Sequence, residues 1–306
     1  MLDVRRLRLL RELAHRGTIA AVAEALAFTP SAVSQQLSAL EREAGLPLLE
    51  RSGRRVVLTP AGRTLVRHAE TVLEQLEQAT ADLAGARQGL AGPLRIGTFP
   101  SAGRTMIPAA LRTLARQHPA LEPMISEIDP ARVADALRAA ELDAALIHEY
   151  DFAASRAEPG LGTEALCTEA MYLASAAASA HAPLVRVELA DPAAISHRRD
   201  ASWITATPGT MCHQMTMHAC QAAGFTPHAR HRVDDFATTL ALVAAGQGVA
   251  LVPQLGLADP PPGIVLTRVP LSRRTRIAYR SGAARHPAVA AVSAAFRSAV
   301  PAELRP

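Results

Sequence analysis

The sequence predicts two parts of different fold class: a small all-α winged head with a long linker helix, followed by a larger α/β domain. Three observations support this division. Residues 1–60 contain three short amphipathic segments and a hairpin pattern, and residues 61–91 begin with one apolar stripe of heptad spacing. Residues 92–306 alternate strand and helix patterns. A chain of 306 residues, 49% of them hydrophobic, is long enough for two or more domains with real cores.

The first amphipathic segment spans residues 3–16. Its apolar residues recur at steps of three and four, which predicts a helix that braces the rest of the head. Arg5, Arg6, Arg8 and Arg11 lie on or near its other side. These arginines are placed to touch a phosphate backbone, and a solvated charged face explains them equally well.

Two further helices are expected, separated by the break Phe28-Thr29-Pro30. Thr18 can cap the first of them, and Pro30 suits the first turn of the second because no helical hydrogen bond is lost there. The outward face of the second carries Ser31, Ser34, Gln35 and Ser38. On the second helix of a helix-turn-helix such side chains suit base edges and phosphates, since Gln can pair with adenine through two hydrogen bonds. The alternative is a solvated polar face.

Residues 46–59 alternate apolar and polar side chains around a basic tip at residues 51–55, which predicts a short hairpin. A basic tip on such a wing would contact phosphate. The residues predicted to contact DNA are therefore Thr29, Ser31, Ser34, Gln35, Ser38, Arg51, Arg54 and Arg55.

A long helix is expected from Pro60 onward, with apolar residues at alternating steps of four and three. This stripe consists of Leu65, Ala69, Val72, Leu76, Ala79 and Leu83. A helix of this length has no core of its own, so the heptad spacing predicts pairing with the same helix of a second subunit. The alternative is packing against its own chain.

Glycines at 85, 89 and 92 before Pro93 indicate a domain boundary. Beyond it, strands are expected at 94–98, 121–128, 144–148, 202–205, 228–233, 249–252, 264–269 and 276–279. Helices are expected at 106–117, 131–140, 211–223, 235–245 and 289–298. Such alternation favours a mostly parallel sheet.

The run TPSAVSQQLSALEREAGLPLLERSGRRVVLTPAG resembles the winged helix-turn-helix signature of LysR-type transcriptional regulators. The likeness covers about the first ninety residues. It implies a homodimer or homotetramer whose linker helices pair and whose heads bind two half-sites of promoter DNA, with RNA polymerase as a possible further partner. The chain departs from the family at Gln35, where many members carry Arg, and at Pro30, one place before the usual proline. The resemblance therefore does not determine which bases are preferred.

The remainder resembles the effector-binding half of the same family, through LRIGTFPSAG at 94–103, LRAAELDAALI at 137–147 and the run at 208–253. That half has a periplasmic-binding-protein-like fold of two α/β lobes with the chain crossing between them twice. The resemblance implies a first lobe of residues 93–165 plus 268–306 and a second lobe of residues 166–267. It also implies hinges near 165 and 267.

Two loops are expected to face a cleft between the lobes: residues 100–103 and 207–210, each leading into a helix. Ligands of open α/β sheets bind beyond the carboxyl ends of strands, where free helix N–H groups favour anions such as carboxylates. In the family that the chain resembles, these loops lie at the effector site. The residues expected to bind a small effector are therefore Ser101, Ala102, His148, Thr207, Gly209, Thr210 and Phe236. Small hydroxyl residues at helix starts are otherwise ordinary caps.

Metal and catalytic motifs are not indicated. Cys212, His213, His218 and Cys220 have a soft donor set, but their spacing on one helix does not make them converge. The G-x-G at 246–248 precedes a strand, whereas a nucleotide loop follows one. No nucleophile elbow or P-loop occurs, so we expect no metal, no cofactor and no enzyme.

The resemblance implies a bacterial protein, and the cysteine content agrees with a reducing compartment. The N-terminus lacks the apolar core of a signal peptide, no stretch of about 18 apolar residues could span a bilayer, and three scattered cysteines make no disulfide framework. A cytoplasmic protein is expected. The net charge of +4 permits nucleic-acid binding without requiring it. All 32 basic residues are Arg, which more simply reflects a GC-rich genome than a phosphate-binding surface.

The combined prediction is a DNA-binding transcriptional regulator of LysR type that a small effector switches by changing the arrangement of the two lobes. One alternative is a constitutive repressor whose cleft has no function. The other is a small-molecule-binding protein or enzyme of the two-lobed class, on which the head serves only as a tether.

Overall fold

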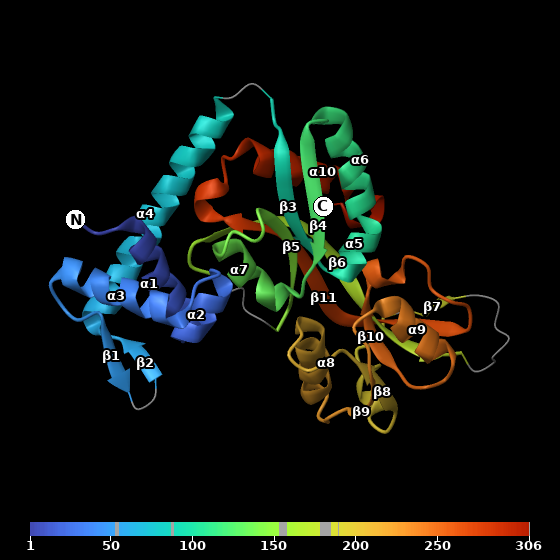
Figure 1. The fold of residues 1–306 in the computed structure, drawn as a ribbon. Coiled ribbons are helices and arrows are strands. Elements are labelled where there is room, and N and C mark those ends of the chain that lie inside the picture. The colour runs from blue at the N-terminus through green and yellow to red at the C-terminus, as the bar shows by residue number, and fades with distance from the viewer. Residues whose placement is uncertain (53–54, 87–88, 153–157, 178–184, 189, 306) are drawn as a thin grey trace.

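The computed structural model describes residues 1–306 except 53–54, 87–88, 153–157, 178–184, 189 and 306. Figure 1 shows the N-terminal head in blue, the long helix α4 rising from it, and an α/β part in two lobes. Helices α5, α6, α7 and α10 belong to the upper lobe in this view, and helices α8 and α9 to the lower one.

The head begins each of its helices at a side-chain cap. Asp3 accepts hydrogen bonds from the N–H groups of Arg5 and Arg6, and Thr18 and Thr29 cap the next two helices in the same way. The predicted helices and hairpin are confirmed as α1 (Val4–Arg16), α2 (Ile19–Ala25), α3 (Pro30–Ala44), β1 (Leu49–Ser52) and β2 (Arg55–Leu58). Their shared core is formed by the apolar stripes of α1, α2 and α3.

The linker helix α4 (Pro60–Gly85) is confirmed as a single long helix. The Thr59 hydroxyl accepts a 3.0 Å hydrogen bond from the Gly62 N–H and caps it. Gly62 lies so close to the Leu48 carbonyl that a Cβ there would collide with it. Glycine is therefore required where α4 passes the wing, which gives the T-P-A-G sequence at 59–62 a steric reason.

The α/β part is built on a seven-stranded sheet with the order β10-β6-β11-β5-β3-β4 and β7 beside β11. Its strands are β3 (Gly92–Thr98), β4 (Leu121–Glu127), β5 (Ala144–Tyr150), β6 (Leu161–Ala176), β7 (Arg186–Glu188), β10 (Ala250–Pro253) and β11 (Ile264–Arg280). Strands β3, β4 and β5 are parallel, but β11 runs antiparallel to both β5 and β6. The expected mostly parallel sheet is therefore wrong for the strands that join the lobes.

Among the elements that the sequence did not predict correctly, which also include β7 and the short helix at 100–105, strands β6 and β11 join the two lobes. β6 was not expected at all, and β11 is one strand of 17 residues instead of two short ones. Pro270 cannot donate to a strand ladder, and a register shift between Val269 and Ser272 accommodates it. Each strand contributes to the cores of both lobes, so the chain crosses between the lobes within continuous strands.

Helices cover the large sheet, and a second, parallel two-stranded sheet lies in the lower lobe. That sheet consists of β8 (Ser202–Thr205) and β9 (His228–Arg232). The helices are α5 (Pro100–Thr105), α6 (Ile107–Gln117), α7 (Pro130–Arg138), α8 (Met211–Ala222), α9 (Phe236–Ala244) and α10 (Pro287–Ala299). Short 3-10 turns are η1 (Ser196–Arg198), η2 (Gln254–Leu257), η3 (Ser281–Ala283) and η4 (Ala302–Leu304).

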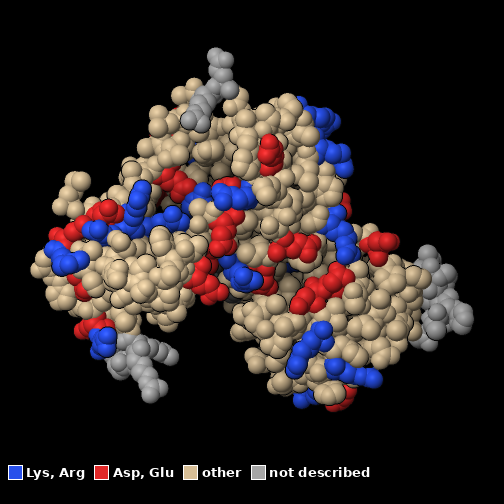
Figure 2. Space-filling model, viewed as in Figure 1, with Lys and Arg blue, Asp and Glu red and all other residues tan. Residues whose placement is uncertain are grey.

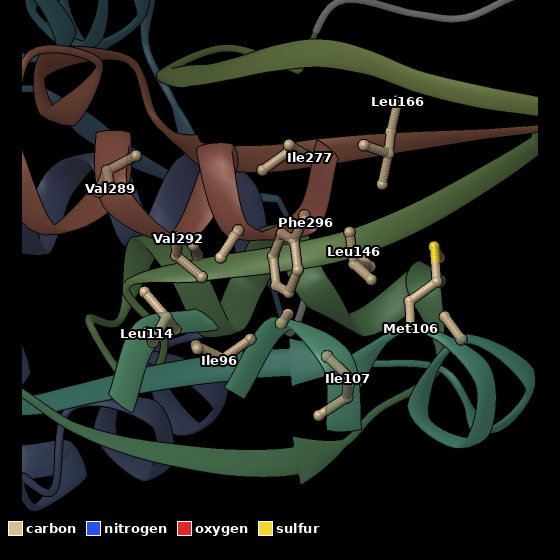
Figure 3. Close-up of a cluster of buried hydrophobic side chains, with 14 of the residues drawn as sticks. Ile96, Met106, Ile107, Leu114, Leu146, Leu166, Ile277, Val289, Val292 and Phe296 are labelled. Atoms are coloured by element: carbon tan, nitrogen blue, oxygen red, sulfur yellow. The ribbon is translucent and has the colours of Figure 1, made fainter. Parts of the chain in front are cut away.

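The core of the upper lobe lies between its sheet and its helices (Figure 3). Ile96 and Leu146 from the sheet meet Leu114 of α6 and Val292 and Phe296 of α10, and each of the five is at most 1% exposed. Close packing of this kind makes a rigid platform. It holds the carboxyl ends of β3, β4 and β5 at one edge of the lobe, where they face α8 and α9.

The head contacts the upper lobe through α1 and α7. Arg8, Arg11 and Arg16 of α1 each donate to a backbone carbonyl in the last turn of α7 or just beyond it, over 3.0, 3.3 and 3.2 Å. The carbonyls of Arg138 and Ala139 lie at the C-terminal end of the helix, where carbonyls lack an intrahelical partner, so Arg8 and Arg11 cap it. The Asp135 carbonyl accepts from the Ala139 N–H as well as from Arg16. None of the helices in the described part of the chain combines the length and apolar composition needed to cross a membrane.

Candidate DNA-binding face and effector cleft

The outward face of α3 carries the side chains predicted to read bases. Ser34, Gln35 and Ser38 are exposed and line a shallow groove together with residues 45–47. The opposite face is buried in the core of the head by Val33, Leu37 and Leu40. α3 therefore presents its polar face to solvent on a rigid support, as a helix that enters the major groove must.

At the start of α3, Thr29 is a helix cap as well as a predicted DNA contact. Its Oγ1 accepts from the Ala32 N–H at 3.2 Å and lies 3.1 Å from the Oγ of exposed Ser31. In the wing, exposed Arg51 lies on β1. Arg54 lies outside the described residues, and for Arg55 only the backbone pairing with Ser52 is described.

The heptad stripe of α4 divides into two parts. Leu65 and Ala69 pack into the core of the head, and Ala69 has no exposed surface. They are thus engaged by their own chain and not free for a partner helix. The members beyond them are exposed, at 40% for Val72, 47% for Leu76 and 71% for Leu83, and Ala79 is also exposed. Within this stripe, the apolar side chains are exposed to solvent only from Val72 onward.

A cavity of about 220 Å³ lies between the lobes, beyond the carboxyl ends of β3, β4 and β5. Four of the residues predicted to bind an effector line it: Ser101, His148, Thr210 and Phe236. The two lobes share the site, since Ser101 and His148 come from the upper lobe and Thr210 and Phe236 from the lower. Two further lining residues, Cys212 and Arg273, were not predicted as effector ligands.

The other three predicted effector residues do not line the cavity. Ala102 is fully buried in the core of the upper lobe. Thr207 donates from its N–H and its hydroxyl to the two carboxylate oxygens of Asp234, both at 2.7 Å, and so orients a lining residue. Gly209 is exposed with φ of +97°, which fits the turn before α8. These residues belong to the core or to the loops beside the cavity, and their contact with an effector stays a prediction.

Arg273 of β11 is the main residue that sequence reasoning missed. Its Nε donates to Glu169 Oε1 at 2.7 Å and its Nη2 to Ser101 Oγ at 2.9 Å, and the residue is completely buried. The guanidinium stacks over Phe99, with Cζ 4.9 Å from the ring centroid. Its Nη1 is buried without a hydrogen-bond partner in the described part of the protein. A buried donor of this kind is an incomplete binding group.

Comparisons with known proteins agree with this combination of head and cleft. A model of the bacterial regulatory helix-turn-helix proteins of the LysR family matches residues 4–63, and a model of the LysR substrate-binding domain matches residues 87–301. The chain belongs to the LysR family of transcriptional regulators. As a LysR-type regulator it joins a DNA-binding head to an effector-binding domain, and the predicted fold class and function are confirmed.

Curated relatives of this LysR-type regulator include probable hydrogen peroxide-inducible genes activators of mycobacteria. The protein from Mycobacterium avium is 30% identical over 294 residues, which is 91% of this chain and 88% of the relative. The protein from Mycobacterium xenopi is 43% identical over 141 residues, 46% of this chain and 75% of the relative.

Solved structures of similar fold cover almost the whole regulator. A cysteine variant of full-length OxyR from Pseudomonas aeruginosa has a TM-score of 0.61 at 25% identity and covers 97% of this chain and 98% of its own. A hydrogen peroxide-bound cysteine variant of OxyR from Corynebacterium glutamicum has a TM-score of 0.54 at 27% identity. The match covers 98% of this chain and 96% of that one. The fold is also that of full-length CbnR in complex with its target DNA, with a TM-score of 0.53 at 22% identity, covering 98% of this chain and all of that one.

The ionisable groups of the regulator's cleft are shifted by burial. Burial, and then the charge of Arg273, lower the pKa of His148 well below its usual value, so the imidazole is neutral. Burial likewise raises the pKa of the Cys212 thiol, which lies 3.4 Å from the Tyr150 hydroxyl. For Arg273, burial alone would lower the pKa, but Glu169 reverses this and the net shift is upward. The guanidinium is therefore the permanent cation of the site.

The cysteines and histidines of α8 are dispersed. Cys212 lies at the cavity and Cys220 in the core of the lower lobe, while His218 stacks on Phe152 with ring centroids 4.6 Å apart. Within the described ranges, no three His, Cys, Asp or Glu side chains gather in a way that could hold a metal ion.

Proposed function

We propose that this LysR-type regulator binds promoter DNA as a homodimer or homotetramer and is switched by a small effector with an anionic group that binds Arg273 and Ser101. The observation that carries the proposal is the unpartnered Nη1 of Arg273 at the wall of the cleft. A carboxylate oxygen would complete this donor, and hydrogen bonds to a charged partner contribute about 1.5–3 kcal/mol.

The site is built to hold that guanidinium in place. Glu169 accepts from Arg273 Nε and also from the Leu255 N–H at 2.6 Å, so the carboxylate is itself fixed. The Ser101 hydroxyl is held by Nη2 at the start of α5. A donor that is already oriented loses little freedom when a ligand arrives, which favours affinity for a small molecule.

The switch follows from the position of the cleft. Ser101 and Phe236 lie on opposite lobes, and Arg104 of the upper lobe pairs with Asp235 of the lower one at 3.1 Å. An effector that contacts both lobes stabilises the arrangement in which they are close, and it shifts the equilibrium only by its difference in affinity between arrangements. The linker helices would transmit that shift to the spacing of the two heads on DNA.

The proposal is tested by a thermal-shift screen of small carboxylates on the full-length protein, followed by footprinting of its promoter with and without the best ligand. A binder should raise the melting temperature with concentration and change the footprint. Ser101→Ala should weaken binding of that ligand up to about tenfold, since one hydrogen bond contributes roughly 0.5–1.5 kcal/mol. Ser298→Ala, on α10, serves as the matched control. If a saturating ligand leaves the footprint and the affinity for DNA unchanged, the constitutive alternative holds.

Hydrogen peroxide is a second candidate effector, favoured by the position of Cys212 in the cleft and by the names of the relatives. In that reaction the thiol of Cys212 takes one oxygen atom from peroxide, giving a sulfenic acid and releasing water. The raised pKa of Cys212 counts against it, because the thiolate is the reactive form. Cys212→Ser should leave regulation intact if an anion is the effector. Loss of regulation, with a mass gain of one oxygen in the treated wild type, would favour peroxide.

We also infer that the protein acts in the cytoplasm, where promoter DNA is, and that it is not an enzyme. The sequence carries no catalytic motif, and the LysR family consists of regulators. The alternative in which the head serves only as a tether is tested by Gln35→Ala. A head that only anchors the lobes would tolerate this change, whereas a head that reads DNA should lose promoter binding.

A further inference from the structure

We propose that the effector is a small zwitterion, in which a carboxylate binds Arg273 and a protonated amine binds among the carboxylates that line the cleft: Glu127, Asp129 and Asp234. This inference rests on the function proposed above and specifies the class of effector. It takes the unpartnered donor of Arg273 as one end of the binding site and the acidic group as the other.

The three carboxylates reach the cavity from different elements of both lobes. Glu127 ends β4, and Asp129 caps the start of α7, both in the upper lobe. Asp234 lies between β9 and α9 in the lower lobe. All three line the same cavity as Arg273, so they are grouped by the tertiary structure although more than a hundred residues separate Asp129 from Asp234. Figure 2 shows several acidic side chains on the surface where the two lobes meet.

None of these carboxylates has a cationic partner among the described side chains. Asp129 accepts from the Ala131 N–H at 2.9 Å, and Asp234 accepts from Thr207. Neighbouring acids differ, because Asp143 pairs with Arg95, Asp235 with Arg104 and Glu149 with Arg274. The acids at the cavity are thus the ones left without a neutralising charge in their surroundings.

The charges of the cavity do not fit an effector that is only an anion. Arg273 is already matched by Glu169 at 2.7 Å, and His148 is neutral, so the three rim carboxylates remain uncompensated. A plain carboxylate bound at Nη1 would share the cavity with these three negative charges, which disfavours it. An amine on the same molecule removes that repulsion and supplies donors to the acids.

The other side chains that line the cavity restrict the part of the effector between its two charged groups. Phe99, Ile128 and Phe236 provide apolar surface between the two charged ends. The Nδ1 of His148, 5% exposed overall, is a second buried polar atom with no partner in the described structure, which again indicates that the cavity is made for a polar occupant. A volume of about 220 Å³ lies below the roughly 300–1,000 Å³ of drug-sized pockets, so the ligand is of amino-acid size.

A metal cation is a weaker explanation for the acidic group. In the part of the chain that the structure describes, the three carboxylates do not come together as a coordination shell. An ammonium group does not need a complete shell of carboxylates, because one or two of them can accept its N–H donors while water accepts the rest.

The test is a binding series on the full-length protein with matched ligands, using alanine, 4-aminobutyrate and ornithine, each beside its carboxylate analogue without the amine and its amine analogue without the carboxylate. Calorimetry should show at least one amino acid binding ten or more times more tightly than both of its analogues. Equal binding of the amino acid and the deaminated carboxylate would overturn the zwitterion and leave the anionic-effector function standing. Failure of both to bind would overturn the two proposals together.

Variants identify the acidic end independently. Glu127→Gln, Asp129→Asn and Asp234→Asn keep the shape and the backbone caps while removing charge. Each should weaken the amino acid at least fivefold and leave the deaminated carboxylate unchanged or bound more tightly. Glu122→Gln, an exposed acid at the far end of β4, is the matched control and should change neither. If a variant weakened the amino acid and the deaminated carboxylate equally, the acids would only maintain the shape of the cleft, which would contradict the inference.

Discussion

Arg11 of the DNA-binding head donates from Nη2 to the backbone carbonyl of Arg138, 3.3 Å away, at the C-terminal end of α7. The other end of α7 begins at Asp129 and Pro130, which line the effector cleft. One helix of nine residues therefore has the cleft at its first turn and the head at its last. A short helix moves as a unit, so a shift at the cleft would reach α1 directly.

This arrangement predicts that Arg8 is needed for the response to effector more than for binding itself. Arg8 donates to the Ala139 carbonyl at 3.0 Å. In Arg8→Ala, affinities for effector and for DNA, each measured alone, should stay within about twofold, while the factor by which effector changes DNA affinity should fall toward one. Arg5→Ala, exposed on the same helix, is the control. An unchanged coupling factor in Arg8→Ala would show that the signal does not pass through this contact.

The buried pair of Arg273 and Glu169 predicts a large cost when one partner is removed. Glu169→Gln should destabilise the effector-binding domain by about 3–5 kcal/mol, because it leaves a buried guanidinium uncompensated. The double variant Glu169→Gln, Arg273→Met should recover part of that loss. Urea denaturation followed by the fluorescence of Trp203, buried in the lower lobe, measures it. A single variant as stable as wild type would mean that solvent reaches the pair.

Glu12 predicts a pH dependence of the head. Burial raises its pKa, but hydrogen bonds and charges from Arg11 and Arg16 outweigh this, and the net pKa lies below the usual 4.5. A depressed carboxylate pKa stabilises the fold fully above 4.5, and the contribution is lost as pH falls through the folded-state pKa. Below pH 4.5, wild type should therefore lose stability more steeply than Glu12→Gln in urea titrations followed by helical circular dichroism. Parallel curves for the two proteins would contradict this.

Gln35 predicts a change in base preference. Gln favours adenine, so Gln35→Ala should lose about 1–3 kcal/mol of discrimination at one position of the operator. Arg51→Ala should weaken all sequences alike and reduce the salt dependence of binding by about one phosphate contact. Binding to a library of operator variants at several salt concentrations separates the two. Unaltered base preference in Gln35→Ala would place sequence reading elsewhere on α3.

The exposed part of the α4 stripe predicts the dimer contact. Leu76→Glu places a charge at a side chain that is 47% exposed and should dissociate the oligomer, which light scattering after gel filtration would show. Gln75→Glu, exposed beside it, should have no effect. If Leu76→Glu leaves the mass unchanged, the subunits associate through another surface.

Most of the head could be predicted from the sequence because its signals are local. The cap at Thr18, Pro30 in a first turn and apolar steps of three and four place three helices to within a few residues. The cleft was predicted in part, because strand ends such as Ser101 and His148 are visible in the alternation of elements. Ala102, Thr207 and Gly209 do not line the cavity, since side-chain direction within a turn depends on packing that no local pattern encodes.

The sequence by itself determined the family, the order of elements in the head and the polar face of α3, all of which depend on spacings of a few residues. Only the tertiary structure decided that β6 and β11 run through both lobes. It also decided that Arg273 meets Ser101, which is 172 residues away, and that three acids line the same cavity. The physical reason is that strand pairing and interlobe packing bring distant positions together, and their geometry is set by the whole core.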